Sequence, residues 1–142
     1  MSNAQSKEGF TIVLPDSWKN ETIYTYKGPD DSGVQHNLVV MVDTELETQD
    51  LYSYAQQRIQ AMMNTLNGFE LLGQRERPLK SGLGAYEAVF KWIPTEGKVI
   101  FQKQVYLISD GKGYNFTASF SKKTLKTIGN DVDAIIDSFT PA

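Results

Sequence analysis

Hydrophobic and polar residues alternate along most of this chain, whereas two stretches repeat apolar residues at helical spacing. The alternating or short apolar runs predict seven strands, at 10–14, 22–26, 37–43, 69–77, 85–93, 99–109 and 114–121. Apolar residues three and four positions apart predict helices over 48–66 and 125–139. The expected order of elements is therefore βββαββββα.

Turn-forming and capping residues separate these elements. Thr48 is expected to cap the first helix, and Asn67-Gly68 supplies a left-handed stop at its end. Gly129 either weakens the middle of the second helix or marks a break in it. Glycine-containing turns at 80–82, 94–97 and 110–113 join consecutive strands, so the second half is predicted to be an antiparallel meander.

This pattern predicts an α+β fold. Each helix has one apolar stripe to bury, so we expect an antiparallel sheet of six to seven strands with the helices packed on one face. Residues 9–142 show no linker or repeat and are expected to form a single domain. Residues 1–8 are polar and are expected to be a disordered N-terminus or a remnant of an expression vector, which Ser2-Asn3-Ala4 resembles.

The strand at 114–121 predicts a second, unusual sheet face. Its odd-numbered residues, from Asn115 to Ser121, are polar but uncharged, and its even-numbered residues, Tyr114, Phe116, Ala118 and Phe120, are aromatic or small. The same reading of parity places further residues in one set: Ile23, Thr25, Asn37, Val39, Met41, Gln102, Gln104, Thr117 and Ser119. If these residues share a face, that face can hold an apolar peptide or helix and satisfy its few polar atoms. The alternative is that neutral polar residues simply tolerate a solvated sheet face.

Composition limits the classes of function. The 142 residues carry a net charge of -3 and a pI near 5.1, and their basic residues are scattered, which argues against a nucleic-acid partner. The absence of cysteine excludes disulfides, a thiolate metal site and a thiol nucleophile. No apolar run is long enough to insert in a membrane, and the first residues lack a secretory signal. We expect a cytoplasmic protein, or a periplasmic lipoprotein if a native leader was removed.

Catalytic chemistry is not evident, and we expect neither an enzyme nor a cofactor or metal. His36 is the only histidine and has no evident triad around it. Asp30-Asp31 lies in a turn that lacks the spacing of a calcium loop, and the glycine-rich segment at 81–84 lacks the Lys-Ser/Thr ending of a phosphate loop. Arg58 is more informative, because it lies among the apolar positions of the first helix and either snorkels to water or meets a partner.

Element order and local motifs resemble the DcrB-like family of the PsbP-like fold, and within it the Eag-type chaperones of type VI secretion effectors. The resemblance spans nearly the whole chain. It rests on the segments 14–18, 37–43, 66–69 and 104–105 together with Ile23 and Tyr54.

The resemblance implies a homodimer that holds the N-terminal transmembrane helices of a toxin effector before secretion. The positions matching the helix-binding surface of that family are Ile23, Thr25, Asn37, Met41, Arg58 and Gln104. Ile23 and Gln104 keep the expected residue type. The other four positions differ from the family. Thr25 stands where the family has an apolar residue, Asn37 and Met41 where it has small hydroxyl residues, and Arg58 where it has an amide. An exported accessory protein of the DcrB or PsbP kind, binding protein or lipid at an envelope, is the alternative.

Overall fold

The computed structural model describes residues 2–7, 10–18, 22–31, 34–125 and 128–140, with no side chains described for 2–10 and 29–36. The elements run in the order β1 (Ser2–Lys7), β2 (Phe10–Pro15), β3 (Thr22–Asp31), β4 (Val34–Asp43), α1 (Leu51–Thr65), β5 (Glu70–Glu76), β6 (Tyr86–Thr95), β7 (Lys98–Ser109), β8 (Lys112–Phe120) and α2 (Gly129–Asp137). From β2 onward this is the predicted order. The structure contains one additional strand, β1, which pairs with β2. The sequence predicts no element at the residues of β1.

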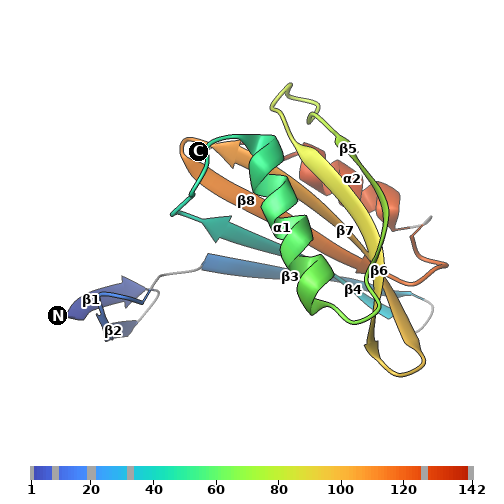
Figure 1. The fold of residues 1–142 in the computed structure, drawn as a ribbon, viewed down its shortest axis with the longest axis horizontal. Helices are drawn as coiled ribbons and strands as arrows, with labels where there is room; N and C mark the ends of the chain where they lie inside the picture. Colours follow the sequence, from blue (N-terminus) through green and yellow to red (C-terminus); the bar gives the residue numbers. More distant parts are fainter. Residues whose placement is uncertain (1, 8–9, 19–21, 32–33, 126–127, 141–142) are drawn as a thin grey trace.

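Six strands form one antiparallel sheet in the order β3-β4-β8-β7-β6-β5 (Figure 1). The predicted meander is confirmed as β5-β6-β7-β8. Asp110 and Gly111 both have positive φ in the two-residue turn between β7 and β8, as a tight hairpin requires. The α+β class with a six-stranded antiparallel sheet and two helices is thus confirmed.

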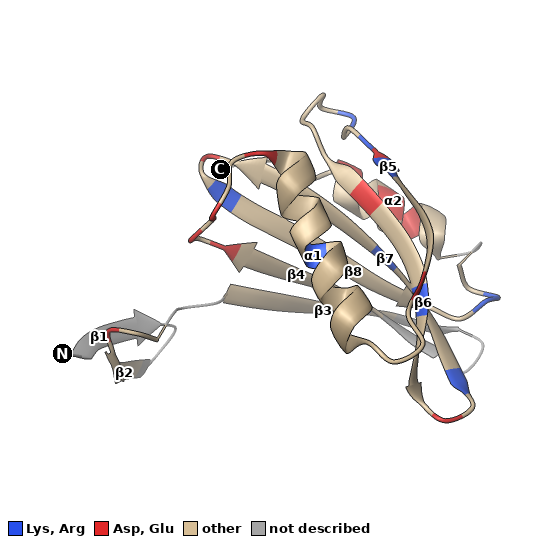
Figure 2. Ribbon diagram, in the orientation of Figure 1, with Lys and Arg blue, Asp and Glu red and all other residues tan. Residues whose placement is uncertain are grey.

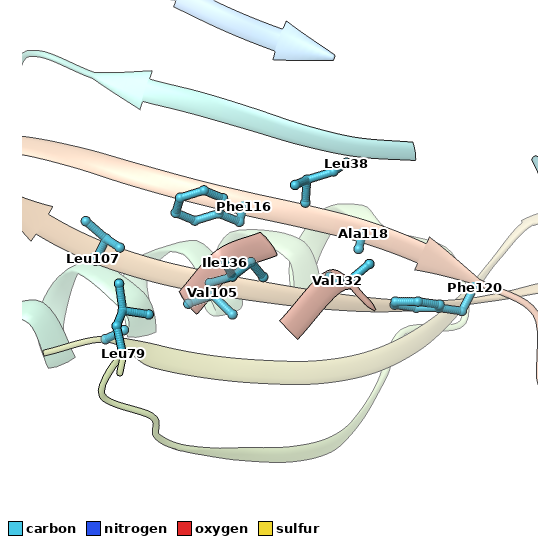
Figure 3. Close-up of a cluster of buried hydrophobic side chains, with 10 residues drawn as sticks. Leu38, Leu79, Val105, Leu107, Phe116, Ala118, Phe120, Val132 and Ile136 are labelled. Carbon is cyan, nitrogen blue, oxygen red and sulfur yellow. The ribbon is translucent and has the colours of Figure 1, made fainter. Parts of the chain in front are cut away.

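The prediction that both helices pack on one face was wrong. Tyr54, Ala55 and Ile59 of α1 pack on Tyr86, Ala88 and Tyr106, whereas Val132 and Ile136 of α2 pack on the other face of the sheet, where Val105, Leu107 and Phe116 lie (Figure 3). Figure 1 shows α1 in front of the sheet and α2 behind it. The physical reason lies in β7, where Val105, Tyr106 and Leu107 are all fully buried. A strand that is apolar on both parities needs cover on both faces.

Helix boundaries differ from the prediction at both helices. Asp50, not Thr48, caps α1, and its carboxylate accepts a hydrogen bond from the Ser53 backbone N–H at 3.0 Å. Two hydrogen bonds from Ser53, from its side chain and its backbone, lower the pKa of Asp50. The predicted stop is confirmed, since Gly68 has φ +66°. Helix α2 begins at Gly129, so this glycine marks a break and does not lie in mid-helix.

Candidate functional site

The sheet face that carries α1, called here the α1 face, gathers the residues that parity placed in one set. In the register of the sheet, Ile23 lies opposite Met41, and Met41 lies opposite Asn115. A second row runs Thr25, Val39, Thr117 and Gln104 across four strands. Ser119 pairs with Gln102 in a third row. Apart from Asn37, the sequence-based set of strand residues is therefore a single surface, and its role in partner binding stays a prediction.

Asn37 is the least typical member of this set. It pairs with Lys27 at the end of the face, where β3 contains a bulge after Lys27. Asn37 also lines a groove on the opposite face of the sheet. It therefore lies at the border between the two faces.

Helix α1 covers only part of this face. It packs mainly on β6 and β7 and reaches the end of β4 through the pair of Arg58 with Asp43, so most of the described β3 and β4 side of the same face is not covered by α1. Ile23 is 54% exposed, and Val39 and Met41 are half-buried, whereas Gln104 lies in the covered part at 9%. Figure 2 shows the described parts of β3, β4 and β8 to be uncharged over most of their length. The result is a partly open surface of apolar and neutral polar side chains beside a helix.

Neutral hydrogen bonds cross the α1 face from strand to strand. The indole N–H of Trp92 donates to Gln102 at 2.8 Å, and the Gln102 amide donates to the Ser119 hydroxyl at 2.9 Å. In the next row, the Gln104 amide donates to the Thr117 hydroxyl at 3.0 Å. These bonds hold the amide side chains in place without charge, so the face presents neutral polar groups in fixed positions.

Tyr106 determines how the Gln104 amide is oriented. Its phenol is fully buried and donates a hydrogen bond to the side-chain oxygen of Gln104. Burial raises the pKa of Tyr106 well above its ordinary value, so the phenol remains a donor at neutral pH. The amide nitrogen of Gln104 is consequently directed toward Thr117.

Arg58 lies at the edge of the α1 face and is already paired. Its guanidinium lies 3.2 Å from the Asp43 carboxylate and 5.4 Å from the centre of the Tyr54 ring. Burial raises the pKa of Tyr54, an effect that the Arg58 charge partly offsets. These residues line a small pocket of about 240 Å³ that also includes Met41. The side chain of Arg58 is about one-third exposed, so it can both reach water and contact a partner, as the sequence analysis predicted.

The opposite face carries a larger apolar groove that the sequence analysis missed. It has a volume of about 560 Å³ and lies between β3, β4, β8 and α2. Its lining residues are mainly aromatic and aliphatic, including Tyr24, Tyr26, Val40, Phe116, Ile135 and Phe139. Tyr24 and Tyr26 alternate with Ile23 and Thr25 along β3, so the two tyrosines on the even-numbered positions were a sign in the sequence of an apolar surface on this second face.

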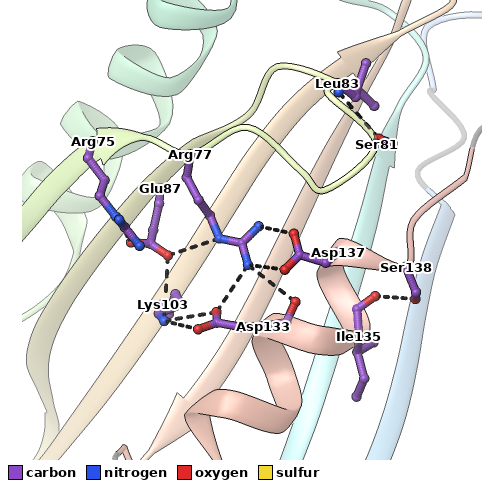
Figure 4. A network of polar contacts seen from close by, with 10 residues as sticks. All are labelled: Arg75, Arg77, Ser81, Leu83, Glu87, Lys103, Asp133, Ile135, Asp137 and Ser138. Atoms are coloured by element: carbon purple, nitrogen blue, oxygen red, sulfur yellow. Dashed lines mark hydrogen bonds and ion pairs between the residues drawn. The ribbon is translucent and has the colours of Figure 1, made fainter.

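A cluster of charged residues holds α2 against the sheet beside this groove (Figure 4). Arg77 pairs with Asp137 at 3.1 Å, and Lys103 pairs with Asp133 at 3.1 Å. Glu87 is 4% exposed and has a carboxylate oxygen 2.9 Å from Arg75. Its other oxygen lies 3.5 Å from Arg77 and 3.6 Å from Lys103. The cluster contains three cations and three carboxylates, and such pairing is the condition for burying charges.

The described residues form no candidate metal site. No group of three His, Cys, Asp or Glu residues among the described residues is arranged to hold a metal ion. The side chains of His36, Asp30 and Asp31 lie outside the description. Among the helices described, neither is long and apolar enough to cross a membrane.

Comparison with solved structures defines the class of fold. Three structures align over 99%, 100% and 99% of this chain, all at low identity. They are protein PA94 of unknown function from Pseudomonas aeruginosa (TM-score 0.76, 16% identity, 97% of that chain), the cyanobacterial PsbP protein CyanoP from Synechocystis (0.58, 15%, 92%) and LpqN of Mycobacterium tuberculosis, which is involved in cell envelope biogenesis (0.54, 17%, 79%). The fold is therefore PsbP-like.

A family model places the chain more narrowly. The DcrB model matches residues 8–138, which is nearly the whole chain, so the protein belongs to the DcrB family. No curated protein matches it.

Proposed function

We propose that this protein is a non-enzymatic chaperone or adaptor that binds apolar helices of a secreted effector on the open part of the α1 face. The observation that carries the proposal is the composition of that surface. Exposed Ile23 and half-buried Met41 supply apolar contact, and the partly exposed hydroxyls of Thr117 and Ser119, held by Gln104 and Gln102, supply neutral hydrogen-bonding groups. An unpaired charge would be costly against an apolar helix, and Arg58 at the edge of the face is paired with Asp43.

The energetic benefit to a client is direct. A transmembrane helix that is still in water exposes its apolar side chains, which costs a free energy of roughly 25 cal/mol per Å² of apolar surface. A chaperone that covers one side of such a helix suppresses aggregation. The resemblance to Eag-type chaperones supports the more specific proposal that the client is a type VI secretion effector with apolar N-terminal helices. In that role the protein acts in the cytoplasm.

An envelope accessory protein is the second candidate. It is favoured by DcrB family membership and by the fold shared with LpqN, a protein involved in cell envelope biogenesis. In this role the same face would bind an envelope protein or lipid. A lipoprotein signal in the full-length gene would favour this candidate.

Co-expression with the effector encoded beside this gene tests the proposal. We expect a soluble complex that copurifies with the intact effector and is lost when its apolar N-terminal helices are deleted. Ile23→Asp places a charge on the open part of the α1 face and should abolish the complex. Val99→Asp is the matched control, because Val99 is 48% exposed and Ile23 is 54% exposed, yet Val99 lies near the β6–β7 turn. Equal copurification of wild type, Ile23→Asp and Val99→Asp would refute the proposal.

A further inference from the structure

The apolar groove on the face opposite α1 has no part in the proposed function. Its volume of about 560 Å³ lies within the roughly 300–1,000 Å³ that is typical of small-molecule sites. Tyr24, Tyr26 and Ile135 line the groove, and they are 49%, 57% and 52% exposed. Large apolar side chains that gather in a groove and stay open to water are the mark of a binding site.

The contacts of α2 show how this helix runs along the groove. Just after the helix, the ring of Phe139 lies 4.9 Å from the ring of Tyr114 in β8. Near its start, Asp133 pairs with Lys103, whose neighbour in β8 is Ala118 (Figure 4). Tyr114 and Ala118 are separated by roughly 13 Å along the strand, at about 3.3 Å per residue. The end of α2 therefore lies toward Tyr114, and its first turn lies toward Ala118.

The charged residues of the groove lie together at the Ala118 end. Among the described residues that line the groove, only Lys27 and Asp131 are charged. Asp131 lies in the first turn of α2, and Lys27 lies opposite Asn37, next to the row of the sheet that contains Ala118. Both side chains are exposed, and neither forms an ion pair with another described residue. The groove is thus amphipathic, with an unpaired cation and an unpaired anion at one end of an apolar channel.

We propose that the apolar groove binds a single-chain lipid with a zwitterionic phosphoethanolamine head. The acyl chain lies between the strands and α2 and points toward Tyr114. At the charged end, Lys27 pairs with the phosphate, and Asp131 pairs with the ammonium group. A fatty acid or a phosphoglycerol lipid fits less well, because its anionic head would leave Asp131 without a cation. The site lies on the other face of the sheet from the open part of the α1 face, so it does not depend on the proposed function.

Calorimetric titration with lauroyl lysophosphatidylethanolamine, kept below its critical micelle concentration, tests this proposal. We expect one lipid per chain, a stoichiometry that native mass spectrometry checks independently. Glycerophosphoethanolamine has the head but no chain and should show no measurable binding. Lauroyl lysophosphatidylglycerol has the same chain but no ammonium group, so it should bind about threefold to fivefold more weakly, as expected for the loss of an exposed ion pair.

Substitutions separate the contribution of the chain from that of the head. Ile135→Asp places a charge on the wall of the groove and should abolish binding, whereas Ile23→Asp, a control of similar exposure on the α1 face, should bind like the wild type. Asp131→Asn should weaken binding of the phosphoethanolamine lipid by about threefold to fivefold and remove its advantage over the phosphoglycerol lipid. Lys27→Gln should weaken binding of both lipids by a similar factor. Circular dichroism checks that each variant is folded, and the two head-group variants decide if Ile135→Asp is not.

Three results overturn the proposal. The first is a wild type that binds no lipid, and the second is equal binding by Ile135→Asp and Ile23→Asp when both are folded. The third is equal affinity of the wild type for the two lipids, with no effect of Asp131→Asn. A dimer that excludes the lipid and dissociates in Ile135→Asp is a case of the first result, because a second copy of the chain then covers the groove.

Discussion

Gln104 is expected to be as important for the fold as for binding. Gln104→Leu keeps a similar side-chain volume but removes the acceptor of the Tyr106 phenol, which is fully buried. A buried donor left unpaired costs about 1–3 kcal/mol. The lost hydrogen bond to Thr117 should cost less, because Thr117 is partly exposed and its hydroxyl keeps a contact with Asn115 at 3.4 Å. We therefore expect Gln104→Leu to lower the free energy of unfolding by about 2 kcal/mol.

A double-mutant cycle isolates this hydrogen bond. Tyr106→Phe alone leaves the Gln104 oxygen without its donor, but combined with Gln104→Leu it leaves no orphaned polar atom at that bond. The double variant should therefore lose less stability than the two single variants together, by about 1–2 kcal/mol. Urea unfolding followed by circular dichroism measures all four proteins.

Gln102→Leu is the matched control for this cycle. It makes the same substitution in the neighbouring row, where both hydrogen-bond partners of Gln102 are only partly buried, so it should cost less than about 1 kcal/mol. Additive effects of Gln104→Leu and Tyr106→Phe, or an equal cost for Gln102→Leu, would refute the reasoning. The cycle also matters for function, because loss of a client in a Gln104 variant is informative only if the variant is folded.

Three further predictions concern stability. Gly113→Ala should destabilise the protein by about 1–3 kcal/mol in urea unfolding, because a Cβ there would lie 2.7 Å from the Tyr54 ring. Glu87→Gln should cost about 3–5 kcal/mol in the same assay, because it removes the most buried carboxylate of the cluster and leaves its three cations with only Asp133 and Asp137 as counter-charges. Burial raises the pKa of Tyr106, so above pH ~10 the unfolded chain binds fewer protons than the folded one and stability falls with rising pH. Tyr106→Phe should flatten this alkaline loss by up to about 1.4 kcal/mol per pH unit.

Each of these predictions has a control or a refuting result. Gly84→Ala should be nearly neutral, because the nearest atom to its new Cβ is 3.9 Å away. Glu70→Gln breaks only the exposed pair with Lys91 and should cost less than about 1 kcal/mol. An unchanged alkaline slope in Tyr106→Phe would contradict the assignment of that slope to Tyr106.

Periodicity and parity predicted the class of fold, the order of the elements and the grouping of the α1 face. They succeeded because alternation fixes which side chains share a face once the strands are identified. In β8, Asn115 and Thr117 lie on one face, and Phe116 and Ala118 on the other, as the pattern requires. The spatial order of the strands was not predictable, since the β4–β8 pairing joins residues far apart in the sequence.

The missed features depend on tertiary structure. Placing both helices on one face ignored that Val105 and Tyr106 make β7 apolar on both sides, a signal present in the sequence. The charged cluster around Glu87 joins β5, β6, β7 and α2, and no sequence spacing predicts such a contact. The apolar groove likewise forms only when α2 lies beside β4 and β8. Strand β1 was missed because its polar sequence carries no clear strand pattern, whereas β2 was predicted from its apolar residues.

Site-specific photocrosslinking tests the central claim most directly. A benzophenone amino acid is placed at position 23 on the open part of the α1 face, or at position 99 as the control, in protein co-expressed with the neighbouring effector. The account predicts an adduct from position 23 that mass spectrometry maps to an apolar N-terminal helix of the effector, and none from position 99. Adducts of equal yield from both positions, or from position 23 only to polar segments of the effector, would contradict it.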